Sequence, residues 1–427
     1  MLAKTLFILL GLIALAVPVA AVLGWLGLTM QYLESPMPLH RAIGDMVWQT
    51  GKDFLLVAIP MFILLGEILL RSGIAERMYD GIVKWLGWLP GGLMHANTGS
   101  CALFAATSGS SVATAATIGT VAIPQIERRG YNERLFLGTV AAGGTLGILI
   151  PPSINLILYG LLTDTSVPEL YLAGFIPGFL LAALFMATVV VLCLVKPGWG
   201  GEPITVSWAE RVAALPALLP PIGIFLVVVG SIYAGLATPT EAAALGVIAA
   251  LGLAAANGTL TITMLRDAIE GTMRTTSMIM LIILAAIFLN FVLSVIGLTQ
   301  ALADFVTGLG MTPMQTMLVI VAVLLVIGCF METLSMLLTT APLIAPIVFA
   351  LGFDPVWFGI LLMVLLETAL ITPPIGINLY VVQGVRERGD LSDVMIGAAP
   401  FVVTMIAMLA LLLIFPDIAL WLPGLFY

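Results

Sequence analysis

Charged side chains are scarce in this chain of 427 residues, since Asp, Glu, Lys and Arg together make up only 9% of it. A soluble domain normally has about a quarter of its residues charged. Hydrophobic residues reach 61%, the mean hydropathy is +1.19, and apolar runs of about 20 residues, each long enough to cross a bilayer as a helix, recur along the chain. The composition predicts an all-α polytopic membrane protein, in contact with membrane lipid, whose backbone amides are satisfied within helices. No basic stripe is present, so we expect no nucleic-acid partner.

Residues that carry redox or catalytic chemistry are also few. The two histidines, His40 and His95, are too few for haem or zinc chemistry, and the three cysteines, Cys101, Cys193 and Cys329, lie far apart in apolar stretches. Buried apolar cysteines are a better interpretation than a disulfide or a metal site. The sequence has neither a serine-nucleophile motif with a membrane histidine nor a nucleotide-binding P-loop. We therefore expect a protein that is not an enzyme and does not use ATP itself.

The first 21 residues resemble a signal peptide, with Lys4 followed by an apolar core. The apolar run continues to Tyr32, however, which favours a retained membrane segment. The sequence leaves open whether residues 5–33 form one helix or two short helices broken near Pro18.

The two halves of the chain repeat one another at a constant offset in residue number. Three features of the first half recur in the second half at this one offset, which argues for two similar structural halves. They are Pro124 with Pro346, Gly130-Tyr131-Asn132 with Gly352-Phe353-Asp354, and Pro151-Pro152 with Pro373-Pro374.

The distribution of basic residues indicates how these halves are oriented. The segment 91–126 has basic residues on both flanks, whereas no Lys or Arg occurs between Arg274 and Arg386, around the matching segment 315–349. The flanking residues of the first segment are Arg71, Arg77, Lys84, Arg128, Arg129 and Arg134. By the positive-inside rule, the first segment begins and ends in the cytoplasm and the second begins and ends outside. The sequence thus predicts inverted repeats, an architecture common among secondary transporters.

Segment 91–126 is too polar for a span that faces lipid. Midway it contains Ser108, Gly109, Ser110 and Ser111, after Asn97-Thr98-Gly99-Ser100. Small hydroxyl residues can also serve close helix packing. Glycine permits a non-helical backbone, and serine adds acceptors, so the cluster favours a chain reversal buried in protein, a re-entrant hairpin.

Paired prolines interrupt two otherwise apolar spans, at Pro151-Pro152 and Pro373-Pro374. Each pair removes two backbone donors and frees carbonyls one turn upstream. At membrane depth a bound cation is a good partner for such carbonyls, and the next half-helix presents its positive end to an anionic group. A single break could be a structural kink, but the same break in both halves favours a binding site.

Four carboxylates lie within apolar stretches, where such groups are usually functional or paired. They are Glu67, Glu241, Glu332 and Glu367. Glu332 and Glu367 sit near the second hairpin and the second break. Glu241 follows Thr238-Pro239-Thr240, so a helix N-terminal acid is the simpler interpretation.

These motifs together resemble the large membrane subunit of tripartite ATP-independent periplasmic (TRAP) transporters over nearly the whole chain. The matching stretches occur in the family's order: SGSSVATAATIG (108–119), GTLGILIPPS (144–153), TPTEAAA (238–244), MET (331–333) and ITPPIGIN (371–378). The resemblance implies an elevator-type carrier with two hairpins and two broken helices, coupled to sodium. It also implies a separate small four-helix membrane subunit, a periplasmic substrate-binding protein and a place in the bacterial inner membrane.

Carried over residue by residue, the resemblance implies two sodium sites. The first lies between the first hairpin and the first break, and the second lies between Gly328 and the second break, where Ala369 replaces a glycine frequent in the family. The first site comprises Ser108, Ser110, Ser111, Gly147, Ile150 and Pro152, and the second comprises Gly328, Ala369, Thr372 and Ile375. We expect the solute to bind beside the two breaks, at Ser153, Asn155, Gly376 and Asn378.

The predicted organisation alternates between scaffold and transport segments. Residues 1–90 form N-terminal membrane helices and scaffold, and 91–162 the first half of the transport domain. Residues 163–314 form scaffold helices and the start of the second repeat, 315–385 the second transport half, and 386–427 a C-terminal helix.

The leading hypothesis is a sodium-coupled carrier for a carboxylate-bearing solute, an organic acid or a related small solute. A proton-coupled carrier that uses Glu332 or Glu367 is its main rival, followed by a channel and then an intramembrane enzyme. Dicarboxylates, sugar acids, other organic acids and zwitterionic solutes all remain open as the substrate.

Overall fold

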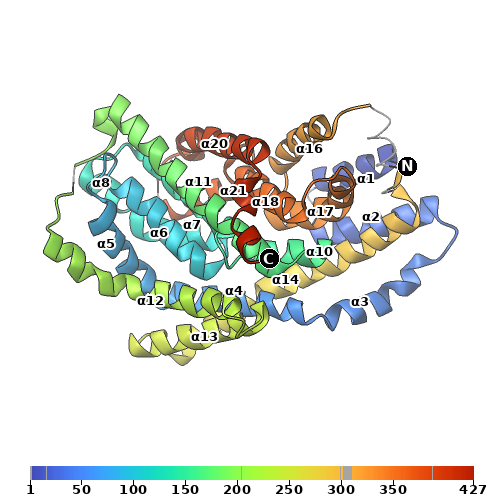
Figure 1. Cartoon of the computed structure of the whole chain (residues 1–427), viewed down its shortest axis with the longest axis horizontal. Helices are drawn as coiled ribbons and strands as arrows, with labels where there is room; N and C mark the ends of the chain where they lie inside the picture. Colours follow the sequence, from blue (N-terminus) through green and yellow to red (C-terminus); the bar gives the residue numbers. More distant parts are fainter. Residues whose placement is uncertain (1, 16, 203, 299, 302–309, 387) are drawn as a thin grey trace.

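In the computed structural model (Figure 1), all residues are described except 1, 16, 203, 299, 302–309 and 387, most of which fall in the predicted segment 163–314. The described residues are overwhelmingly helical, and the β contact among them is one isolated bridge between Tyr131 and Gly200. The predicted all-α class is therefore confirmed.

The first half of the chain supplies helices of very different lengths. They are α1 (Leu2–Ala14), α2 (Val19–Glu34), η1 (Leu39–Ala42), α3 (Ile43–Gly51), η2 (Phe54–Val57), α4 (Ala58–Arg71), α5 (Ile74–Leu86), α6 (Leu93–Ser108), α7 (Ser111–Ala122), α8 (Gln125–Arg129), α9 (Glu133–Leu149), α10 (Ile154–Thr163) and α11 (Val167–Val195).

The second half continues with longer spans and a second set of short helices. They are η3 (Pro197–Trp199), α12 (Trp208–Tyr233), α13 (Pro239–Ala256), α14 (Ile262–Val295), α16 (Pro313–Gly328), α17 (Thr333–Ala350), α18 (Pro355–Ile371), α19 (Ile377–Val385), α20 (Leu391–Ile414), α21 (Asp417–Leu420) and η4 (Pro423–Leu425).

Many of these helices are long and apolar enough to cross a membrane. Within the described residues there are 7 such helices, and a bent pair, α9 with α10, adds an eighth span if it counts as one. The two members of this pair meet at an angle of 42°. The chain is accordingly a multi-pass membrane protein.

The N-terminal region contains two helices rather than one, which answers the question left open by the sequence. Helix α1 ends at Ala14 and α2 begins after Pro18, its N-cap. Lys4 in α1 pairs with Glu34 at the end of α2 at 2.8 Å, so the two helices lie antiparallel.

The repeat predicted from the prolines extends to helix boundaries. The first residues of α9 and α18, and their last residues as well, are related by the same offset as the two proline pairs. Their N-caps correspond too, since Asn132 accepts a hydrogen bond from Leu135 N at 3.0 Å and Asp354 accepts one from Val356 N at 2.8 Å. The first residues of α7 and α17 are again related by this offset.

The two broken helices run in opposite directions. Tyr159 in α10 donates a hydrogen bond to Pro355 O at 2.7 Å, which places the end of the first broken helix at the start of the second. Arg386, directly after α19, pairs with Glu133 at the start of α9 at 2.8 Å. Each broken helix therefore begins where the other ends.

Helices α6 and α7 form a hairpin against α9. Positions along α6 meet positions along α9 in the same order, and positions along α7 meet them in reverse order. The pairs are Asn97 with Thr139 and Cys101 with Gly143 for α6, and Gly119 with Val140, Ala115 with Gly144 and Ser111 with Gly147 for α7. The chain thus reverses at residues 109–110, inside the polar cluster where the sequence predicted a reversal.

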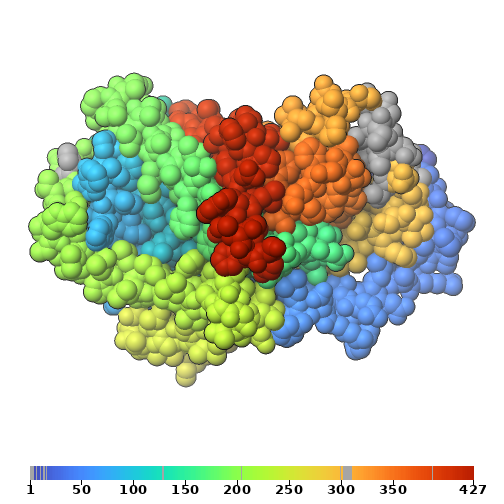
Figure 2. Space-filling view, viewed as in Figure 1, coloured from blue at the N-terminus to red at the C-terminus, as the bar shows by residue number. Residues whose placement is uncertain are grey.

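The remaining helices surround these elements. Helix α14 contacts α2 and α4, and α13 contacts α4. Helix α12 contacts α5 and α13, whereas α11 contacts α9, α18 and α20. In Figure 1, the hairpin α6–α7 and the pair α16–α17 lie on opposite sides of α18. Figure 2 shows the C-terminal residues in the middle of the viewed face, where α21 contacts α11 and α18.

Candidate functional site

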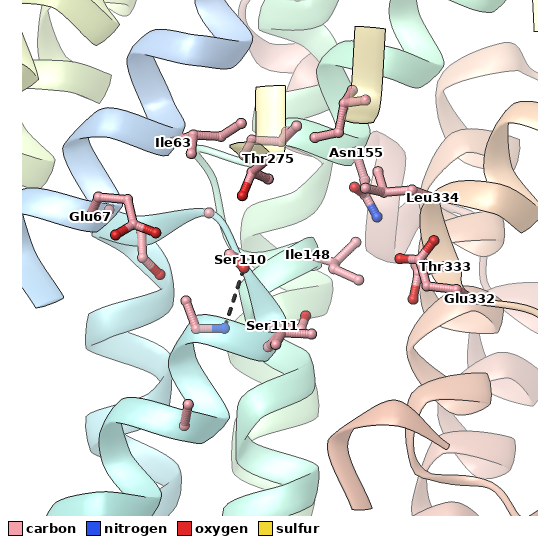
Figure 3. A pocket seen from close by; sticks show the side chains of 18 of the residues that line it. Ile63, Glu67, Ser110, Ser111, Ile148, Asn155, Thr275, Glu332, Thr333 and Leu334 are labelled. Carbon is pink, nitrogen blue, oxygen red and sulfur yellow. Dashed lines mark hydrogen bonds between the residues drawn. The ribbon is translucent and has the colours of Figure 1, made fainter. Parts of the chain in front are cut away.

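A cavity of about 420 Å³ lies where several helix ends meet. Its lining includes residues 108–113 of the first hairpin, residues 332–334 before and within α17, and the start of α10. Helices α4 and α14 contribute Ile63, Gly66, Glu67, Leu70, Thr275, Met278 and Ile279, and Ala116, Ile148 and Leu370 complete the lining. Figure 3 shows Ser110 and Ser111 between Glu67 and Glu332, with Asn155 close to Thr333.

The first hairpin touches the first break backbone to backbone. A Cβ atom added to Gly147 would lie 2.7 Å from both Ser110 C and Ser111 N, so no side chain fits between α9 and the hairpin. Gly109 has a φ of 62°, in the left-handed region, and a Cβ there would lie 2.6 Å from Pro152 O. Glycine is thus required at both positions for this close approach.

The three predicted serines lie together at this contact. Ser111 donates to Thr145 O at 3.2 Å, Ser110 accepts from Ala113 N at 3.4 Å, and Ser108 lies 3.2 Å from the Thr114 hydroxyl. A serine that donates its proton to a carbonyl keeps its oxygen lone pairs for another partner. The structure therefore brings Ser108, Ser110, Ser111, Gly147 and Pro152 together.

Ile150 lies within the first break but faces a different neighbour. Its backbone is extended after α9, its N–H donates to Leu146 O at 3.0 Å, and its side chain is fully buried. A Cβ on Gly178 of α11 would lie 2.7 Å from the Ile150 side chain, so α11 supports the break from behind.

The second predicted ion site is also brought together. Ile375 N donates to Cys329 O at 3.3 Å, which links the second break to the residues after α16. A Cβ on Gly328 would lie 2.8 Å from the Ala369 Cβ, so these two residues are in direct contact. Thr372 donates its hydroxyl proton to Thr368 O at 2.6 Å, which leaves its lone pairs available.

The four predicted solute residues divide into two groups. Asn155 lines the cavity, and Ser153, fully buried, caps α10 by accepting from Leu156 N at 3.4 Å. Gly376 and Asn378 lie at the start of α19 instead, where Asn378 donates to Ala141 O at 3.1 Å. Ser153, Gly376 and Asn378 are not among the residues that line this cavity.

The four membrane carboxylates have different surroundings. Glu67 pairs with Arg71 on the same helix, and Glu241 forms a capping box with Thr238, as expected of a helix N-terminal acid. Glu332 caps α17 by accepting from Ser335 N at 3.0 Å and lines the cavity. Glu367 is fully buried, and neither of its oxygens has a hydrogen-bond partner among the described residues.

The contribution of α4 and α14 to the cavity was not predicted. Gly66 approaches the hairpin closely, since a Cβ there would lie 3.3 Å from Ser108 O, and Thr275 comes from the long helix α14. The sequence signal available for α4 was the adjacent pair Gly66-Glu67 in an apolar run. Thr275 has no local signal, because its position in the cavity depends on how α14 packs.

The oxygen atoms where the first hairpin meets the first break, and where the residues after α16 meet the second break, suit a hard monovalent cation. Within the described part of the chain, no three His, Cys, Asp or Glu residues come together in a group that could hold a metal ion. A cation at either contact would instead meet neutral hydroxyl and carbonyl oxygens, the ligand set that broken membrane helices offer to sodium. The donor set at residues 108–111 and 147–152 therefore fits sodium.

A family model and individual relatives assign the chain to the same family. Residues 6–418 match the family model described as "Tripartite ATP-independent periplasmic transporter, DctM component". The chain is 36% identical over 385 residues to the C4-dicarboxylate TRAP transporter large permease protein of Pseudomonas aeruginosa, covering 90% of each chain. It is 33% identical to the sialic acid TRAP transporter large permease protein of Vibrio cholerae, covering 98% of this chain and 97% of the relative.

Solved structures share the fold at low sequence identity. The crystal structure of the Alcanivorax borkumensis YdaH transporter superimposes with a TM-score of 0.65 at 16% identity, covering 92% of this chain and 96% of that one.

Proposed function

The chain belongs to the DctM component family of tripartite ATP-independent periplasmic transporters, and from this premise we propose that it is the permease of a sodium-coupled importer for a carboxylate-bearing solute. Membership makes it the large membrane subunit of a secondary transporter. The observation that carries the proposal of a sodium-coupled importer is the cavity at which both hairpin regions and the start of α10 meet.

The transport mechanism we propose is an elevator. Its moving part comprises the two hairpins and the two broken helices, and its fixed part includes α4 and α14. The cavity supports this division because residues of both groups line it. The antiparallel broken helices support inverted repeats, which would place the two hairpins as re-entrant segments from opposite faces of the membrane.

Sodium binding at the two hairpin–break contacts supplies the coupling in this proposal. Ser108, Ser110 and Ser111 would hold one ion with backbone oxygens of Gly147, Ile150 and Pro152. Thr372 would hold the other with backbone oxygens of Gly328, Ala369 and Ile375. An ion at each contact joins a hairpin to a break, so ion binding favours the closed arrangement from which the solute is carried.

The solute in this proposal carries at least one carboxylate. The N-termini of α7 and α10 open onto the cavity through residues 110–113 and through Ile154 and Asn155. Their caps, Ser110 and Ser153, are neutral, and helix N-termini favour anions. The names of two relatives, one for C4-dicarboxylates and one for sialic acid, are compatible with a carboxylate and leave the rest of the solute open.

The proposed partners are a small four-helix membrane subunit and a periplasmic binding protein, with the complex in the bacterial inner membrane. One relative, an isethionate TRAP transporter permease, is named as a DctMQ protein, and this chain covers 65% of that relative. This name supports a small membrane subunit as a partner of the large one.

Reconstitution into proteoliposomes tests the proposed assembly. We expect little solute uptake by the lone chain and restored uptake when the small subunit and the loaded binding protein are added. Robust uptake by the lone chain would contradict the proposal.

Proton coupling is the second candidate, and one observation favours it. Glu367 is a fully buried carboxyl group without a hydrogen-bond partner among the described residues, and such groups in membranes are usually functional or paired. The neutral oxygens at the two hairpin–break contacts favour sodium over this alternative.

A further inference from the structure

A second cavity, of about 480 Å³, lies where the ends of α10 and α14 meet α17. It shares no lining residue with the cavity at the hairpins and contains none of the residues assigned to the two sodium sites. Its lining comprises Leu162, Thr163, Asp164, Asn290, Ser294, Gly297, Gln300, Ala341, Pro342, Ala345, Pro346 and Phe349.

The positive-inside rule places this cavity at the outer face of the membrane. Helix α14 carries Arg266 and Arg274 near its start, so its other end, which lines the cavity, lies outside. No Lys or Arg occurs between Arg274 and Arg386, and segment 163–165 also has none. No Lys, Arg or His is among the described residues that line the cavity. We call it the outer cavity.

Helix α17 presents unpaired backbone oxygens on this side. Pro342 and Pro346 lie inside the helix, and proline has no N–H, so the carbonyls of Leu338 and Pro342 lack the donor found four residues later in a regular helix. Pro342 lines the outer cavity, and Leu338, Pro342 and Asn290 line a small cavity that adjoins it. Backbone carbonyls away from water normally have a partner. These two therefore call for a donor or a cation.

The end of α10 makes the outer cavity electrostatically negative. Helix α10 ends at Thr163, and a helix C-terminus carries roughly half a negative charge. Asp164, the C-cap, adds a full negative charge, and none of the ion pairs among the described residues includes it. A carboxylate solute would be repelled here, whereas a cation would be attracted.

We propose that the outer cavity binds a sodium ion, held by the Asp164 carboxylate together with side-chain oxygens of Asn290 and Ser294 and the freed carbonyl of Pro342. One carboxylate among neutral oxygens balances a single positive charge, and hard cations prefer oxygen ligands. The site is additional to the two coupling sites. In the proposed elevator, α14 is fixed and α17 moves, so an ion that joins them stabilises the present arrangement. This last step rests on the proposed carrier function, whereas the binding site itself does not.

Charged thiol reagents measure the potential in the outer cavity. The three free cysteines, Cys101, Cys193 and Cys329, are replaced by alanine, and Leu162→Cys places one thiol in the lining without removing a proposed ligand. Trimethylammonioethyl and sulfonatoethyl methanethiosulfonate have similar sizes and opposite charges, and intact-protein mass spectrometry follows their reaction with the purified full chain. Leu236→Cys, at a position 80% exposed after α12, is the reference outside the cavity. We expect the ratio of cationic to anionic reaction rates to be about tenfold or more higher at position 162 than at position 236.

Sodium should compete with the cationic reagent. When sodium replaces choline at constant ionic strength, we expect this reaction at position 162 to slow by about threefold or more, and potassium to slow it less. Asp164→Asn removes the charge and keeps a residue that tolerates the positive φ of 52° found there, so both the charge ratio and the sodium effect should be lost. Asp354→Asn is the matched control, because Asp354 is also an exposed acidic residue, at the start of α18, but does not line the outer cavity. We expect it to retain both effects.

Four outcomes would overturn the proposal. They are equal charge ratios at positions 162 and 236, no slowing by sodium, sodium slowing that persists in Asp164→Asn, and no reaction at position 162 or at a second reporter, Phe349→Cys in α17. Sodium slowing that is lost in Thr372→Ala and kept in Asp164→Asn would assign the effect to the second coupling site. Each of these results would leave the carrier and its two coupling sites standing, since their own variants test them separately.

Discussion

Replacing Gly147 with alanine would place a methyl group against the backbone of the first hairpin. The added Cβ would lie 2.7 Å from the carbonyl carbon and oxygen of Ser110 and from Ser111 N. Backbone atoms of a hairpin cannot rotate away as the end of a flexible side chain can. The hairpin and α9 must therefore move apart, which disturbs the proposed sodium ligands on both sides of the contact.

The size of the effect follows from this clash. Overpacking by one methyl group costs about 1–3 kcal/mol. If this strain opposes the arrangement that binds sodium, the sodium affinity falls by about 5- to 150-fold. The native chain at a sodium concentration 100 times its dissociation constant should gain about 2.7 kcal/mol of stability.

Thermal unfolding of the purified chain in sodium, with choline as the replacement cation, measures this change. We expect the sodium concentration at the midpoint of stabilisation to rise about fivefold or more in Gly147→Ala, in keeping with that cost. Gly252→Ala in α13 is the control, since a Cβ there meets nothing within 4 Å. Native sodium dependence in Gly147→Ala would refute the assignment of the ion to this contact.

Three further predictions concern the second ion site, the topology and a buried ion pair. Thr372→Ala removes one ligand oxygen and should raise the half-maximal sodium concentration for uptake. Glu367→Gln should raise that concentration less, and the reverse ranking would contradict sodium coupling. Single cysteines at positions 130 and 352, where a Cβ has open space, should react with impermeant reagents from opposite sides of the membrane. Labelling from one side would exclude inverted repeats. Arg386→Met removes a guanidinium that is 5% exposed and pairs with Glu133 and Asp393. The free energy of unfolding, measured in denaturant, should fall by about 1–3 kcal/mol. Unchanged stability would show that these ion pairs contribute nothing.

Local sequence signals were sufficient for much of the architecture. The proline pairs and the Gly-Tyr-Asn and Gly-Phe-Asp turns predicted a repeat at a constant offset, and the helices after these turns share both boundaries at that offset. Gly109 predicted a reversal, and the positive φ found there is a conformation that glycine adopts without a steric penalty. These features depend on backbone chemistry close in sequence, which explains why they could be predicted.

Features that depend on distant packing could not be predicted. Arg386 was used only as a topology signal, yet its side chain is nearly buried and binds Glu133 and Asp393. Thr275 lines the cavity only because α14 packs beside α4 and the hairpins. The outer cavity likewise depends on how the end of α14 packs against α10 and α17.

The central claim is that a sodium gradient drives this carrier. It is tested most directly in proteoliposomes that contain the chain, its small subunit and the binding protein loaded with its own ligand. An inward sodium gradient without a pH gradient should drive accumulation of the solute, and an inward proton gradient without sodium should not, because the proposed ligands are neutral oxygens that do not titrate near pH 7. Accumulation driven by the pH gradient alone, and abolished in Glu367→Gln, would contradict sodium coupling.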